Sequence, residues 1–255
     1  MNTKGISHIE VILSFLIFMG FVMFAFYFFS PFEGTRLIES SKEYAFIDLM
    51  KNTSVELGSY PIGLDKDTKN KPEKIIEIVL SGINIEKKVR VENYLGEEIP
   101  SRRDNDIIRV KLEDSIYDEF DGGGDGFILI KFSEDIIPYE PSDDLNGLAL
   151  NDENLIDIGV ANKRTVVSEK RVSDLKNIYE SGTAEYEKLG EYFNLPKRIS
   201  FGFGIIFDDG DKIETLKDIP AGIDVFSEKK RVETLRIKSG KEGKVEFSEF
   251  IVKIW

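Results

Sequence analysis

Residues 4–32 read KGISHIEVILSFLIFMGFVMFAFYFFSPF, and this stretch predicts how the whole chain is organised. A lysine and a glycine precede an apolar run that contains one carboxylate, Glu10. From Val11 to Phe32 no residue is charged, and a helix of that length reaches roughly 33 Å at about 1.5 Å per residue. The hydrocarbon core of a bilayer is roughly 30 Å thick. The sequence therefore predicts a transmembrane helix over residues 6–32.

Glu10 is unusual in such a helix, because an ionised carboxylate at the centre of a bilayer costs on the order of 3 kcal/mol. Cleavage after Gly5 would make Ile6 the first residue and Glu10 the fifth. The new ammonium group and the carboxylate would then lie on one face of the helix. In a bundle of such helices, the carboxylate of one subunit can neutralise the amine of its neighbour. We therefore interpret Glu10 as an assembly residue that sets the axial register between subunits.

This arrangement resembles the class III signal peptide of type IV pilins, pseudopilins and archaeal pilin-like proteins. The matching residues are Lys4 and Gly5 before the cut, Ile9-Glu10 after it, and the apolar helix, so the resemblance covers about the first 32 residues. Ser7-His8 stands where Thr-Leu is commoner, and the leader is very short. The resemblance implies that a prepilin peptidase cuts between Gly5 and Ile6. It also implies a single-pass protein of the cell membrane with a cytoplasmic N-terminus, an extracytoplasmic head and other pilin-like subunits as partners.

Other kinds of N-terminal segment fit less well. A secretory signal peptide has an apolar region of about 7–15 residues and a small-residue cleavage site, and this run is longer and lacks an Ala-x-Ala pattern. A lipoprotein signal needs a cysteine, and the chain has none. An uncleaved signal anchor stays open, with Glu10 lying near the membrane interface.

Two function classes follow from these readings. The first is a pilin-like subunit of a type IV filament or secretion-type assembly, and a length of 255 residues favours a minor subunit. The alternative is a single-pass, signal-anchored ectodomain that binds an extracellular partner without forming filaments.

Composition limits the remaining possibilities. The chain has 47 Asp and Glu against 34 Lys and Arg, a net charge of −13, which argues against a nucleic-acid partner because phosphates would be repelled. The absence of cysteine excludes disulfides and thiolate metal sites. Residues 33–255 are enough for one large domain or two small ones with real cores.

Periodicity predicts an α+β fold in which the apolar helix extends into an amphipathic helix and then a mainly antiparallel β head. We divide the chain into a leader (1–5), the transmembrane helix (6–32), an amphipathic extension (33–57), a β-rich region (58–137) and a helix-plus-sheet region (154–255). The last two regions either form one head domain or stand apart, and residues 138–153 are the best candidate linker.

Alternating apolar residues predict the individual strands of the head. They are expected at 74–80, 84–91, 106–112, 126–132, 199–207, 212–216, 231–237 and 245–255. One further helical region is expected near 172–193, with a break at Ser181-Gly182-Thr183. Apolar side chains that alternate on the strand after it predict core positions at Phe201, Phe203 and Phe207.

The sequence carries little that points to catalysis. His8 is the only histidine and precedes the head, so neither a Ser-His pair nor a His-ligated metal can form in the head. Phosphate-loop, hydrolase and zinc motifs are also missing. We therefore expect neither enzymatic activity nor a cofactor.

Two acidic loops are weak candidates for a hard cation such as Ca²⁺. Residues 118–126 read DEFDGGGDG, with Asp121 and Asp125 as the best oxygen donors, but Phe132 stands where an EF-hand has its bidentate glutamate. Residues 208–211 read DDGD, which a tight turn explains without a metal. Solvated turns are the simpler interpretation of both loops, and we expect no metal site.

Overall fold

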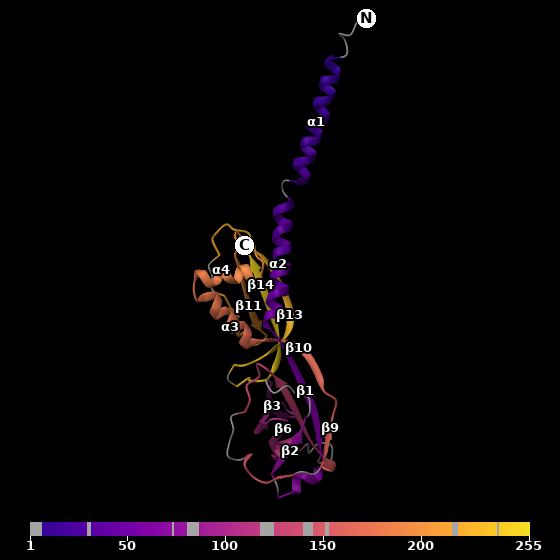
Figure 1. The fold of residues 1–255 in the computed structure, drawn as a ribbon, viewed down its shortest axis with the longest axis vertical. Coiled ribbons are helices and arrows are strands. Elements are labelled where there is room, and N and C mark those ends of the chain that lie inside the picture. Colours follow the sequence, from indigo (N-terminus) through magenta and orange to yellow (C-terminus); the bar gives the residue numbers. More distant parts are fainter. Residues whose placement is uncertain are drawn as a thin grey trace.

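The computed structural model describes residues 7–29, 32–72, 74–80, 87–117, 125–139, 145–150, 153–215, 219–238 and 240–255. Figure 1 shows an elongated molecule with the N-terminal helix at one end and two lobes of β-structure below it. The proximal lobe contains α2 to α4 and β10 to β14, and the distal lobe contains β1 to β9.

Four α-helices lie within these ranges: α1 (Ser7–Phe29), α2 (Phe32–Thr53), α3 (Glu169–Glu180) and α4 (Thr183–Tyr192). Among the residues that the structure describes, no helix meets the length and apolarity needed to cross a membrane. The predicted transmembrane helix over 6–32 is therefore wrong, and so is the predicted single-pass localisation with a cytoplasmic N-terminus and an extracytoplasmic head. The prediction treated the uncharged run as part of one helix, whereas the run covers Val11–Phe29 of α1 and ends at Phe32, the first residue of α2.

The predicted fold class is also wrong in its arrangement of strands. One ten-stranded sheet curls through both lobes and has the order β12-β11-β14-β13-β10-β1-β7-β3-β4, with β9 also paired to β1. A four-stranded sheet in the distal lobe has the order β5-β6-β2-β8. Parallel pairing joins β10 to β13 and β2 to β8, and the other strand pairs within the described residues are antiparallel. The fold therefore differs from the prediction in its one large curled sheet and in lacking a helix able to span a membrane.

The strands of the large sheet are β1 (Ser54–Leu64), β3 (Lys88–Asn93), β4 (Glu98–Ile99), β7 (Gly126–Ser133), β9 (Ile156–Ile158), β10 (Asn162–Ser168), β11 (Phe201–Phe207), β12 (Lys212–Glu214), β13 (Phe226–Leu235) and β14 (Val245–Ile254). Those of the small sheet are β2 (Ile75–Val79), β5 (Ser101–Asp104), β6 (Ile107–Lys111) and β8 (Ala149–Leu150).

Strand β1 was not predicted, because Gly58 and Pro61 indicated a turn. Gly58 faces Phe132 of β7, and a Cβ atom there would lie 2.0 Å from the Phe132 Cζ atom, so only glycine fits. Pro61 lies where the partner of β1 changes from β10 to β9 and the register shifts by one residue. A proline is tolerated at such a bulge because the ladder is already interrupted there.

The second helical region begins three residues earlier than predicted. The Ser168 side chain accepts a hydrogen bond from the Arg171 backbone N–H (3.3 Å) and is the N-cap of α3. The predicted break is present, and α4 starts at Thr183.

Each lobe has its own hydrophobic core. In the proximal lobe, α2 buries Ala45, Phe46 and Leu49 against one face of β13 and β14. The predicted core positions Phe201, Phe203 and Phe207 are confirmed, since all three are buried in this cluster. In the distal lobe the small sheet packs on β1, β3 and β7.

Candidate functional site

Helix α1 exposes apolar side chains in every direction. Twelve large hydrophobic side chains between residues 11 and 26 are exposed by 37–68 %: Val11, Ile12, Leu13, Phe15, Leu16, Ile17, Phe18, Met19, Phe21, Met23, Phe24 and Phe26. A surface helix normally keeps a polar face toward water, and a helix that is apolar all round is normally buried. Burying one such side chain contributes roughly 1.5–3 kcal/mol. Helix α1 is therefore the most conspicuous interaction surface of the molecule.

Glu10 is the acidic residue in the first turn of α1, and it is exposed. A carboxylate at a helix N-terminus is favoured by the helix dipole by about 0.3–1 kcal/mol, which accounts for its position without any partner. The predicted processing site, Gly5 and Ile6, lies outside the described residues. The proposed pairing between Glu10 and a neighbouring amine therefore stays a prediction.

The first acidic loop contains the two predicted cation ligands, Asp121 and Asp125. Asp121 lies outside the described residues, and the Asp125 Oδ1 atom accepts a hydrogen bond from the Lys66 backbone N–H (3.1 Å). Across the described parts of the chain, no three potential metal-ligating side chains come together.

The carboxylates of the DDGD turn bind basic side chains. Hydrogen bonds from Lys241 to Asp209 and from Lys238 to Asp211 (2.7 Å) lower the pKa of each carboxyl group. Both aspartates are therefore occupied by cations that the chain itself supplies.

At the centre of this turn lies Arg236, which is fully buried. Its guanidinium donates to Glu169 (3.1 Å), to Glu246 (2.6 Å) and to Asp211 (3.0 Å), and it lies 3.6 Å from the centroid of the Phe207 ring. These residues, with Asp209, Lys238 and Lys241, form what we call the Arg236 network. It ties the start of α3, the β11–β12 turn and the β13–β14 loop together.

Sequence reasoning missed the Arg236 network, because Arg236 and Glu169 are 67 residues apart and no local motif connects them. A satisfied internal ion cluster of this kind holds loops in place. It leaves no free nucleophile or open coordination position, so we assign it a structural role.

A second charged cluster joins the lobes. In the distal lobe, Lys131 contacts Glu92 (2.6 Å between Nζ and Oε2) and Arg90 contacts Glu98 (3.0 Å between Nη1 and Oε1). The β13–β14 loop closes over them, since Lys131 donates to the Gly243 carbonyl (3.3 Å). Burial raises the pKa of Glu98. Arg90 also lies 3.7 Å from Glu92, and Glu242 on the β13–β14 loop adds a further negative charge that acts on Glu98.

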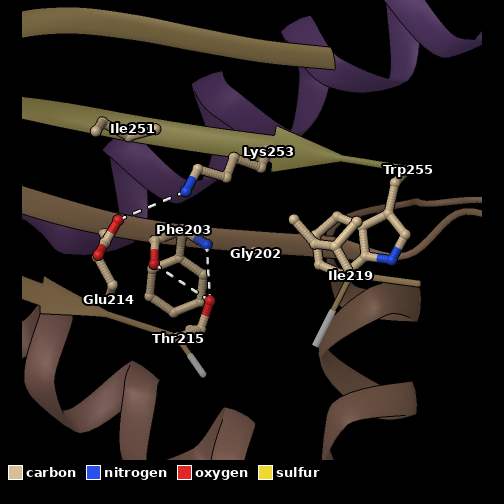
Figure 2. Close-up of a pocket in the computed structure, with 9 residues that line it drawn as sticks. Gly202, Phe203, Glu214, Thr215, Ile219, Ile251, Lys253 and Trp255 are labelled. Atoms are coloured by element: carbon tan, nitrogen blue, oxygen red, sulfur yellow. Dashed lines mark hydrogen bonds and ion pairs between the residues drawn. The ribbon is translucent and has the colours of Figure 1, made fainter. Parts of the chain in front are cut away.

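Figure 2 shows a small cavity on the face of β11 that turns away from the proximal core. Gly202 and Gly204 are among its lining residues, and an ion pair between Lys253 and Glu214 (3.6 Å between Nζ and Oε1) lies along it. Its volume is about 60 Å³, whereas ligand sites typically measure about 300–1,000 Å³. The cavity is too small for a substrate.

A larger groove of about 310 Å³ lies between α4 and the segment that leads into β11. Its lining is apolar and aromatic, with charged residues among it: Tyr186, Glu187, Gly190, Glu191, Leu195, Pro196, Lys197, Ile199 and Phe201. It contains no nucleophile–base pair, and nothing in the structure shows what covers it.

Comparison with protein-family models, curated proteins and solved structures finds no match to this chain. What α1, the two charged clusters and the lobes do is therefore inferred from their own residues.

Proposed function

We propose that this protein is a pilin-like subunit, and a minor one, of a type IV filament or secretion-type assembly. The observation that carries the proposal is α1, a helix of 23 residues whose apolar side chains are exposed on all sides at one end of the molecule. An all-round apolar helix needs partners on every side, and parallel copies of the same helix provide them. The remainder of the chain is a folded head with its own cores.

Within such a bundle Glu10 is the residue that selects the register. If a peptidase removes the residues up to Gly5, the amine of Ile6 lies about one helical turn from Glu10. In the apolar bundle an unpaired ammonium group is costly, so neighbouring helices shift until each carboxylate faces an amine. Losing one partner of a buried ion pair costs roughly 3–5 kcal/mol.

Replacing Glu10 tests this function. Full-length native chain and Glu10→Ala are expressed in the same cells, and high-molecular-weight assemblies are recovered by sedimentation. A cost of 3–5 kcal/mol corresponds to a loss of more than about a hundredfold in association, so Glu10→Ala should be nearly absent from the pellet. Glu10→Asp should be intermediate, because its shorter side chain reaches less far.

Glu39→Ala is the matched control, since it removes an exposed carboxylate from α2. It should assemble at the native level. Recovery of Glu10→Ala in assemblies at the level of the control would contradict the proposed role. Mass spectrometry of the assembled chain should find Ile6 at the N-terminus. An intact Met1 would contradict the pairing, because an uncleaved chain has no free amine at Ile6.

A further inference from the structure

Strand β13 leaves one of its edges open. It pairs with β14 over its whole length, but with β10 only at Thr234 and Leu235. Within the described residues, the side of the Phe226–Glu233 backbone that faces away from β14 has no strand partner. Figure 1 shows β13 beside α2, while β10 leads into the distal lobe. A row of unpaired N–H and C=O groups is a template on which another strand can form hydrogen bonds.

The open edge carries three consecutive basic residues. Lys229, Lys230 and Arg231 are all exposed. Lys229 lies 3.6 Å from Glu249 and Arg231 lies 3.2 Å from Asp208, but exposed pairs of this kind contribute little. Pairing of this edge with the same edge of another copy would set like charges opposite one another, which is unfavourable. Glu228 and Glu233 flank the three basic residues on the same strand. The basic stretch therefore disfavours pairing with its own copy in the register that aligns the three residues, and it favours an acidic partner strand.

The acidic charge of the chain is concentrated elsewhere. Residues 54–160 contain 25 Asp and Glu against 12 Lys and Arg, a net charge of −13, which equals the net charge of the whole chain. Residues 161–255 contain 17 acidic and 18 basic side chains and are close to neutral. The described parts of this acidic segment form the distal lobe, at the end of the molecule far from α1.

The distal lobe also has an open edge with suitable side chains. Strand β9 pairs only with β1, so its other side is open within the described residues. This strand presents the exposed Asp157, and its Ile158 side chain is 46 % exposed. Val160, two residues further on, is 88 % exposed. An open edge with exposed apolar side chains is a site of association.

We propose that the basic stretch of the β13 edge receives the edge of β9, with its exposed Asp157, from a neighbouring copy, so that the sheet of one subunit continues into the next. The inference rests on the proposed function, because α1 association brings the copies side by side. The contact joins two different surfaces, and a contact of this type repeats indefinitely instead of closing as a dimer. It thereby supplies the head-to-head contacts of a filament whose helices supply the core.

Site-directed cross-linking tests the contact, and the absence of native cysteine makes engineered cysteines unambiguous. Full-length chains carrying Lys230→Cys are co-assembled with full-length chains carrying Val160→Cys and then oxidised. We expect a mixed disulfide dimer, because paired strands bring these positions within the Cα separation of about 4.4–6.8 Å that a disulfide needs. Lys188→Cys on α4, whose side chain is 69 % exposed, replaces Lys230→Cys in the control and should give no mixed dimer.

A charge reversal gives a second measurement. Lys229→Glu/Lys230→Glu should reduce lateral association, whereas Lys188→Glu/Lys197→Glu makes the same change in charge on and near α4 and should not. The yield of the mixed disulfide dimer should also fall in 1 M salt, where the Debye screening length is about 3 Å.

The two proposals fail in different ways. If assemblies form and the mixed dimer with Lys230→Cys is no more abundant than with Lys188→Cys, the β9–β13 contact is refuted while the role of α1 stands. If the native chain forms no assemblies, both proposals fall.

Discussion

Replacement of Arg236 by methionine should destabilise the fold strongly. Arg236 is fully buried, and its guanidinium contacts Glu169, Glu246 and Asp211 at 2.6–3.1 Å. Methionine keeps most of the aliphatic volume but removes every charged hydrogen bond and the contact of the guanidinium with the Phe207 ring. The substitution therefore isolates the electrostatic part of the Arg236 network.

The expected loss in the free energy of unfolding depends on the hydrogen bonds that each carboxylate retains in the variant. Removing one partner of a buried ion pair costs roughly 3–5 kcal/mol. Glu169 still accepts hydrogen bonds from the backbone N–H groups of Ile237 (2.7 Å) and Lys238 (3.3 Å), so its charge is not left bare. We therefore expect the lower end, about 3 kcal/mol, a large part of the roughly 5–15 kcal/mol that stabilises a typical domain.

Urea unfolding of the full chain, followed by circular dichroism, measures this loss. Arg231→Met is the control, because Arg231 is exposed and its pair with Asp208 should contribute at most about 1 kcal/mol. Equal unfolding midpoints for Arg236→Met and Arg231→Met would refute the reasoning that burial makes the network strong.

Three further outcomes are expected. Burial raises the folded-state pKa of Glu98, so the charged form of Glu98 opposes folding. As the pH rises above about 4.3, the free energy of unfolding of Glu98→Gln should therefore increase relative to that of the native chain. A difference between the two that stays constant from pH 3 to 8 would contradict this. Gly204→Ala should destabilise the fold by about 1–3 kcal/mol, since a Cβ atom would lie 2.5 Å from the Ile213 carbonyl oxygen. Gly190→Ala in α4 should stabilise the fold by roughly 0.5–1 kcal/mol. Denaturant midpoints of the two variants that move in the same direction would contradict these predictions. Calcium should leave the melting temperature unchanged, because Lys241 already occupies Asp209, and a rise of several degrees would show a site that these contacts do not reveal.

Local patterns predicted the elements whose side chains alternate or recur regularly. The strands at 74–80, 106–112 and 126–132 are present because their apolar residues face one core on alternate positions. The turn at 208–211 and the break before Thr183 also follow from local chemistry. In each case the deciding interaction lies within a few residues.

Features decided by distant partners could not be predicted in this way. Gly58 and Pro61 are turn residues in most contexts, and β1 forms only because Phe132 fills the space above Gly58 and the partner strand changes beside Pro61. Arg236 resembles any surface arginine in the sequence, although three segments fold around it. The fold class failed for the same reason, since the joining of β10 to β13 connects residues about 67 positions apart.

The separation of apolar surface from charge along the molecule limits how copies can pack. The proposed bundle would bring α1 of many copies together, while residues 54–160, whose described parts form the distal lobe, have a net charge of −13. Copies packed in axial register would place these acidic lobes side by side, and unlike surface ion pairs this repulsion has no local partner to offset it. An axial shift places the distal lobe of one copy beside the nearly neutral proximal lobe of the next, where β13 offers its basic edge. Pairing of Glu10 with the amine of a neighbouring helix also requires an axial offset, but one of only about 6 Å, the rise over the four residues from Ile6 to Glu10. Head charge and helix pairing therefore both disfavour packing of the copies without an axial offset, and each can be altered by mutation without changing the other.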